Sequence, residues 1–196
     1  MMTSQATSIE FTLPLWLHEY MQSCESIISL DDRMAFVIKA AERNVIEGTG
    51  GPFAAAIFES DSGKLISLGV NLVTAEQASI LHAEMVAITL AQKKLGTYDL
   101  GGAGLQQHEL VSSTEPCAMC FGAIPWSGLR RVVTGARDED ARQIGFDEGP
   151  KPEDWRSELS RRQIEVVTDI NRDEARQVLI NYRSQGGKIY NSREAG

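Results

Sequence analysis

Cysteine is scarce in this sequence, whose 196 residues include only three cysteines. Disulfide-stabilised domains carry cysteines in even sets, whereas Cys117 and Cys120 lie close together and leave Cys24 without a partner. The sequence therefore excludes a disulfide framework and suits a reducing compartment. We expect Cys24 to be a small core residue.

Long apolar runs are also absent. No stretch approaches the roughly 18 apolar residues that a membrane-spanning helix requires. The first ten residues lack the basic region and apolar stretch of a secretory signal. We therefore expect a cytoplasmic protein that does not associate with membranes.

Basic residues are in the minority, with 19 Lys and Arg against 27 Asp and Glu and a formal net charge of −8. Nucleic-acid binding is dominated by neutralisation of phosphates, which needs a stripe of basic side chains. The pairs Arg130-Arg131 and Arg161-Arg162 are isolated. We therefore expect no nucleic-acid partner.

The residues that are present predict one globular α/β domain spanning residues 1–196, because 42% of them are hydrophobic. Periodicity and breaking residues predict strands at 53–58, 65–70, 109–112, 131–134 and 164–168. Helices are predicted at 13–29, after Asp31 as N-cap, at 82–94, from Cys117 onward, and at 138–143, 153–161 and 173–184. A hairpin followed by alternating strands and helices indicates a mixed sheet of about five strands between two helical layers, a three-layer α/β/α sandwich.

Three residues have the chemistry of zinc ligands: His82, Cys117 and Cys120. Structural zinc usually takes four protein ligands, whereas catalytic zinc takes three and leaves one position to water. The remaining donors, Cys24, His18 and His108, lie in no recognisable ligand spacing. We therefore predict one catalytic Zn²⁺ per chain.

Helix geometry agrees with this prediction. His82 lies in the first turn of a predicted helix, where Glu84 can face the same cleft although it is two residues further on. Pro116 suits the start of a second helix, in which Cys117 and Cys120 share one face. The positive end of that helix favours both thiolates, so two helix starts are expected to converge on one metal.

Other interpretations remain for the single motifs. A Cys-x-x-Cys pair also occurs in thioredoxin-like redox proteins, and a zinc site can simply stabilise a binding protein. Neither role requires a carboxylate that ligates no metal beside the cluster, so Glu84 favours an enzyme.

The His-x-Glu and Pro-Cys-x-x-Cys pattern is that of zinc nucleobase deaminases. Over roughly residues 30–190 the chain resembles the cytidine-deaminase-like superfamily, and within it most resembles the bacterial guanine deaminases. The narrower resemblance rests on residues 50–53, Asn71, Thr74, Glu115-Pro116-Cys117, Trp126 and residues 145–148. The chain departs from that family at Ala54, where glycine is common, in an N-terminal helical extension of about residues 1–30, and in its tail after Tyr190.

The resemblance implies roles for individual residues. Substrate-binding residues would be Phe53, Asn71, Ala83 through its backbone, Trp126 and Tyr190. Catalytic residues would be Glu84, which moves a proton from the attacking water to the ring, and Glu148, which assists proton transfer. Tyr190 would reach the site of the partner in a homodimer with exchanged tails of about residues 186–196.

The implied activity is zinc-dependent hydrolytic deamination of a free nucleobase, guanine to xanthine and ammonia, in purine catabolism. An amino-oxo triazine such as ammeline presents a similar edge. Alternative activities are those of a cytosine or nucleoside deaminase and of a tRNA adenosine deaminase; the acidity of the chain disfavours the latter.

Overall fold

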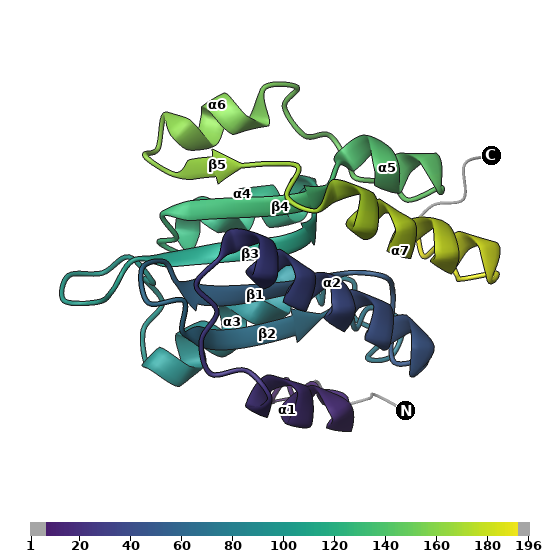
Figure 1. Ribbon diagram of the computed structural model, residues 1–196, viewed down its shortest axis with the longest axis horizontal. Helices are drawn as coiled ribbons and strands as arrows, with labels where there is room; N and C mark the ends of the chain where they lie inside the picture. The colour runs from purple at the N-terminus through teal and green to yellow at the C-terminus, as the bar shows by residue number, and fades with distance from the viewer. Residues whose placement is uncertain (1–6, 192–196) are drawn as a thin grey trace.

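The computed structural model describes residues 7–191, whose framework is a five-stranded sheet (Figure 1). Its strands are β1 (Ala54–Glu59), β2 (Leu65–Val70), β3 (His108–Thr114), β4 (Arg131–Ala136) and β5 (Glu165–Val167). They follow the order β2-β1-β3-β4-β5. β1 runs antiparallel to both neighbours, whereas β3, β4 and β5 run parallel. The expected mixed sheet is confirmed.

Helices cover both faces of this sheet. They are α1 (Leu15–Gln22), α2 (Leu30–Ile46), α3 (Ala83–Leu95), α4 (Ala118–Trp126), α5 (Asp138–Gln143), α6 (Trp155–Ser160) and α7 (Arg172–Ser184). Figure 1 shows α2 and α7 in front of the sheet and α3 and α4 behind it. Among residues 7–191, no helix is long and apolar enough to cross a membrane.

Strand β1 shows why three layers form. Side chains alternate between the faces of a strand, and both faces of β1 are apolar. Ala56 and Phe58 join the core beneath α1, α2 and α7, whereas Ala55 and Ile57 join the core beneath α3, α4 and α6. The three-layer sandwich follows from this burial on both sides.

The sequence prediction was wrong at the start of the chain. α1 ends at Gln22 rather than near residue 29, because Ser26 leaves the helix to form a bridge with Lys64. The N-cap of α2 is Ser29 rather than Asp31, since the Ser29 hydroxyl accepts the backbone N–H of Asp32 at 3.2 Å. Asp31 instead lies in the first turn, where its charge suits the positive helix end.

Candidate active site

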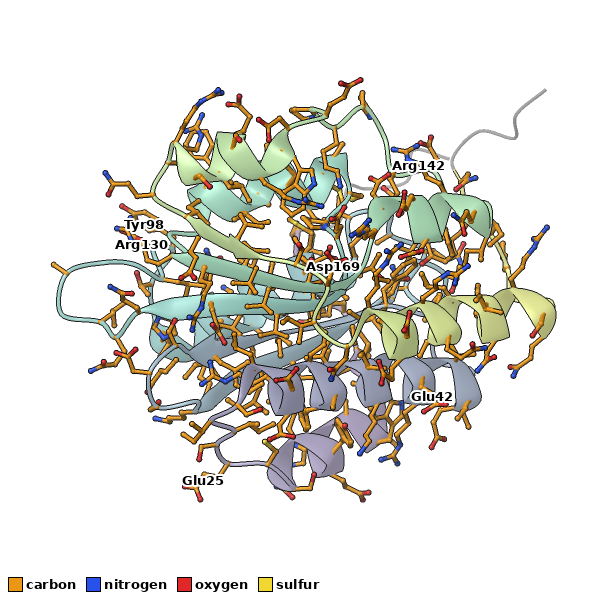
Figure 2. The ribbon with its side chains drawn as sticks, turned by 45° about the horizontal axis from the view of Figure 1, so that its top comes forward. Glu25, Glu42, Tyr98, Arg130, Arg142 and Asp169 are labelled. Atoms are coloured by element: carbon orange, nitrogen blue, oxygen red, sulfur yellow. The ribbon has the colours of Figure 1, made fainter. Side chains whose placement is uncertain are left out.

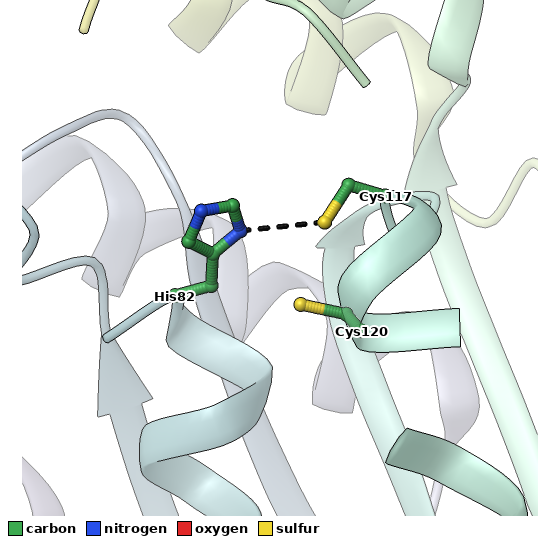
Figure 3. Close-up of side chains that lie close together, drawn as sticks. All are labelled: His82, Cys117 and Cys120. Atoms are coloured by element: carbon green, nitrogen blue, oxygen red, sulfur yellow. Dashed lines mark hydrogen bonds between the residues drawn. The ribbon is translucent and has the colours of Figure 1, made fainter. Parts of the chain in front are cut away.

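The site lies at the edge where β2, β3 and β4 end. α3 begins after the loop of residues 71–82 that follows β2, and α4 begins after residues 115–117, which follow β3. His82 is the N-cap of α3 and Cys117 the N-cap of α4, and neither side chain caps its own helix. Both side chains are therefore free to meet between the two helix starts (Figure 3).

His82, Cys117 and Cys120 form the expected cluster. Their candidate ligand atoms all lie within 4.8 Å of one another, and Cys117 Sγ lies 3.4 Å from His82 Nδ1. Within the described part of the chain this group has no fourth member. One imidazole and two thiols suit zinc, and a three-ligand set is that of a catalytic site.

The protonation of the cluster is unusual. The pKa of Cys117 is lowered to about 4. The main cause is a hydrogen bond from Cys120; burial acts in the opposite direction, and the hydrogen bond and charge of His82 lower the pKa further. The pKa of Cys120 is raised because its thiol donates a hydrogen bond to Cys117 and because it is buried. Burial lowers the pKa of His82, but the bond to Cys117 and the charges of Glu84 and Cys117 outweigh it. A thiolate beside an imidazolium is a donor set that a divalent cation can occupy by displacing protons.

Glu84 lies beside this cluster without belonging to it. It occupies the first turn of α3 and is 7% exposed. Burial, and then the negative charge of Cys117, raise its pKa to about 7. A carboxyl group with this pKa can both accept and return a proton near neutral pH.

A cavity of about 190 Å³ opens above the cluster. Of the residues expected in the site, it is lined by Phe53, Asn71, His82, Glu84, Cys117, Glu148 and Tyr190. Ala83 is not among the lining residues and its side chain packs in the core, although its N–H belongs to the first turn of α3, which leaves such groups without a helical partner.

Trp126, which the resemblance placed among the substrate-binding residues, does not line this cavity. The indole is 85% exposed and lines a separate hollow with Phe121 and Pro125. Trp126 is the last residue of α4, whereas the cavity lies at the other end of that helix.

Glu148 is held inward by its loop. Its backbone carbonyl accepts the N–H of Ala118 at 2.9 Å, which ties the loop to the start of α4. The Glu148 side chain is 7% exposed, and burial first, then the charge of Cys117, raise its pKa to about 8. The neighbouring Phe146 is buried and anchors the loop.

Three aromatic rings form one wall of the cavity. The ring centroid of Phe146 lies 5.0 Å from that of Phe53 and 5.0 Å from that of Tyr190, both in edge-to-face geometry. Within residues 7–191, the buried Tyr190 hydroxyl has no hydrogen-bond partner. A Cβ atom at Gly51 would lie 2.3 Å from that hydroxyl, so this approach requires glycine. Tyr190 thus reaches the cavity of its own chain, and residues 192–196 of the expected tail lie outside the described residues.

Asn71 presents one side of its amide to the cavity. It is 1% exposed, and its Oδ1 accepts the backbone N–H of Val73 at 3.2 Å. Because the oxygen is held this way, the amide N–H groups are left for a ligand.

Sequence reasoning missed several lining residues, namely Val73, Ser79, Ser112, Thr114 and Asn191. Ser112 and Thr114 could have been predicted, because they lie at the end of a predicted strand. Asn191 had no such signal. Its side chain accepts the N–H of Asp147 at 3.0 Å and donates to the carbonyl of Gly145 at 2.9 Å, which joins the tail to the Glu148 loop.

Comparison with known proteins agrees with this geometry. Residues 29–136, more than half of the chain, match the family described as the cytidine and deoxycytidylate deaminase zinc-binding region. Guanine deaminase of Bacillus subtilis (strain 168) is 40% identical over 111 residues, which cover 57% of this chain and 67% of that protein.

Two solved structures superpose on nearly the whole fold. One, described as guanine deaminase from Nitrosomonas europaea, has a TM-score of 0.88 and 43% identity and covers 93% of this chain and 100% of that one. Another, a mutant protein in complex with 8-azaguanine, has a TM-score of 0.88 and 44% identity and covers 91% of this chain and 98% of that one. The chain therefore belongs to the cytidine and deoxycytidylate deaminase zinc-binding family.

Proposed function

We propose that this protein is a zinc-dependent aminohydrolase that converts guanine to xanthine and ammonia. The observation that carries the proposal is Glu84, a buried carboxyl group beside a three-donor metal cluster to which it does not belong. The similarity to guanine deaminases, including the N. europaea structure that matches 93% of this chain, supports guanine as the substrate.

The residues divide the chemistry between them. His82, Cys117 and Cys120 would hold the zinc ion, which as a Lewis acid would lower the pKa of a water molecule towards neutrality. Glu84 takes a proton from the attacking water and returns it to the ring nitrogen beside the carbon that bears the amine. Glu148 delivers a proton to the amine, which departs as ammonia when the carbon–nitrogen bond breaks, and the hydroxyl proton released as the new carbonyl forms returns to Glu148.

The walls of the cavity orient the base. The aromatic side chains of Phe53 and Tyr190 contact a planar ring and exclude water, and the free N–H groups of Asn71 donate to a carbonyl oxygen of the base. A ring without that carbonyl would leave a buried donor unpaired, which costs about 1–3 kcal/mol. Asn71 therefore favours an oxo-purine over rings that carry hydrogen at that position.

Offering guanine, adenine, cytosine, cytidine and ammeline separately, and measuring ammonia release, tests this proposal. We expect guanine to be the best substrate, with ammeline as a slower second substrate because it has a similar amino-oxo edge. Preferential turnover of cytosine or cytidine would assign the chain to a pyrimidine branch of the family, and release of ammonia from none of the five would overturn the proposal.

The same proposal includes the setting of the enzyme. We infer one domain over residues 1–196, a cytoplasmic homodimer, and a place in purine breakdown. In the single chain described, Tyr190 lies in its own cavity. We propose that in the dimer the tail instead swings about the Gly186-Gly187 pair, so that Tyr190 takes the same place in the cavity of the partner. Light scattering of the purified protein tests the dimer. Mixing a Tyr190→Ala chain with a Glu84→Gln chain tests the exchange, because activity returns only if one chain completes the site of the other.

A further inference from the structure

Asn44 is a fully buried amide that touches neither the metal cluster nor the cavity. It lies near the end of α2 and is 0% exposed. Its Nδ2 donates to the carbonyl of Gly51 at 2.9 Å and to the carbonyl of Asn71 at 3.0 Å. Both amide hydrogens are therefore used, one on each of two loops that are separate in sequence.

These two loops carry walls of the cavity. The first leads to Phe53 and the second contains Asn71, and the N–H of Asn71 donates to the carbonyl of Phe53 at 3.0 Å. A Cβ atom at Gly50 would lie 1.9 Å from the Asn71 carbonyl oxygen and 2.7 Å from Asn44 Nδ2. Glycine at this position thus permits the approach that the Asn44 amide bridges.

The orientation of the Asn44 amide is itself fixed. Its Oδ1 accepts the hydroxyl of Thr49 at 2.7 Å, and that hydroxyl accepts the indole N–H of Trp16 at 3.1 Å. A flipped amide would direct its N–H groups at Thr49 and its oxygen at two carbonyl oxygens. Trp16 belongs to α1, so the N-terminal helix ends this chain of hydrogen bonds.

We propose that Asn44 is a positioning residue for recognition of the base, and that α1 secures it through Trp16 and Thr49. Asn44 fixes the backbone at Asn71, and the Val73 N–H then orients the Asn71 side chain, so the amide donors meet the carbonyl edge of the substrate. This role rests on the proposed function. In this proposal the N-terminal extension, through Trp16 of α1, helps to hold the substrate-binding residues in place.

Four variants of the full-length zinc-loaded protein separate positioning from plain stability. Asn44→Ala removes the bridge, and Thr49→Val removes the hydroxyl that orients it while leaving Asn44 in place. Thr49→Ser keeps that hydroxyl. Val37→Ala, two turns earlier on α2 and fully buried, deletes core methyl groups and serves as the destabilised control.

Kinetics should divide the variants. Asn44→Ala should raise KM for guanine about tenfold, as expected for a lost buried hydrogen bond, with a much smaller change in kcat. Inhibition by hypoxanthine, which carries the carbonyl, should weaken in parallel, while inhibition by unsubstituted purine should not. Thr49→Val should shift KM the same way by a smaller factor, and Thr49→Ser and Val37→Ala should match the wild type.

Amide hydrogen exchange gives a readout that needs no substrate. Exchange at Phe53, Asn71 and Val73 should accelerate together in Asn44→Ala and Thr49→Val, and not in Val37→Ala. Unchanged exchange at these amides would refute the positioning role whatever the activity, as would equal weakening of hypoxanthine and purine. If Asn44→Ala does not fold, Thr49→Val decides alone. A wild-type protein that deaminates no base would instead refute the proposed function, and the exchange result would still decide the role of Asn44.

Discussion

Replacing Glu148 by Gln should have opposite effects on turnover and on the stability of the zinc-stripped chain. The change keeps the size of the side chain and the backbone bond from Ala118 to residue 148. The substitution removes the carboxyl group that we propose protonates the leaving amine. Positioned proton transfer is typically worth about 10²–10⁴-fold, so kcat should fall at least about tenfold to a hundredfold while zinc content stays the same.

The stability effect follows from the raised pKa. Chiefly through burial, the pKa of Glu148 rises from 4.5 to about 8, and at about 1.4 kcal/mol per pKa unit the ionised carboxylate destabilises the folded state by about 5 kcal/mol. For an acid with a raised pKa this penalty is absent below pH 4.5 and complete above about pH 8. A buried amide without partners costs about 1–3 kcal/mol at every pH. The Gln variant should therefore be more stable by about 2–4 kcal/mol at pH 9 and no more stable at pH 5.

Urea unfolding with a chelator at pH 5 and pH 9, together with steady-state kinetics of the zinc-loaded protein, measures both effects. Asp147→Asn is the matched control, because Asp147 is the neighbouring acid at the rim of the cavity and its side chain is 69% exposed, and the asparagine keeps an oxygen for the N–H of Gly149. Full kcat in Glu148→Gln would show that the two-carboxylate mechanism is wrong. A stability difference that does not change with pH would show that the carboxylate is not buried as described.

Four further outcomes are expected. Glu84→Gln should keep one zinc per chain and the fold yet lose nearly all turnover; metal analysis and kinetics decide this, and wild-type turnover would remove Glu84 from the mechanism. Cys117→Ser should lose zinc and activity together, and a Cys117-Cys120 disulfide in freshly prepared metal-free protein would favour a redox role. Truncation after Gly187 removes Tyr190 and should raise KM or lower kcat with zinc retained. Unchanged kinetics in a folded truncated protein would show that the tail takes no part in the active site. Asp140, whose pKa is lowered by Arg172 against the effect of burial, contributes stability that is lost as pH falls below its ordinary value of 3.8, so Asp140→Asn should lower the melting temperature at pH 7 and have less effect at pH 3.

The ion pairs around Asp140 also explain how the last helix is placed. The Asp140 carboxylate accepts hydrogen bonds from Arg172 at 3.0 Å and from the backbone of Arg137, whose guanidinium contacts Asp169 at 2.7 Å. Asp169 lies in the loop between β5 and α7 (Figure 2). The network therefore joins α5, α7 and the end of the sheet.

Much of the fold could be predicted because periodicity acts locally. α5 spans residues 138–143 as expected, and β2 spans residues 65–70 as expected. The end of α1 could not be predicted, because Ser26, just after the helix, pairs with Lys64, which is distant in sequence. A bridge of this kind leaves no periodic signal.

The site divides in the same way. His82, Glu84 and Cys117 lie in motifs whose spacing is set by helix starts, so their convergence was predictable. The direction of the Trp126 side chain was not predictable, because the sequence does not say which way an aromatic residue at the end of a helix faces. Asn44 was missed because its partners are backbone carbonyls, which every residue has.

We propose that one three-donor metal site and one adjacent carboxylate make this chain a guanine deaminase. The most direct test of this proposal is to titrate zinc into the metal-free protein while following xanthine formation from guanine. Activity should rise linearly and stop rising at one equivalent of zinc per chain. Xanthine formation without metal, or none at any zinc concentration, would contradict the account.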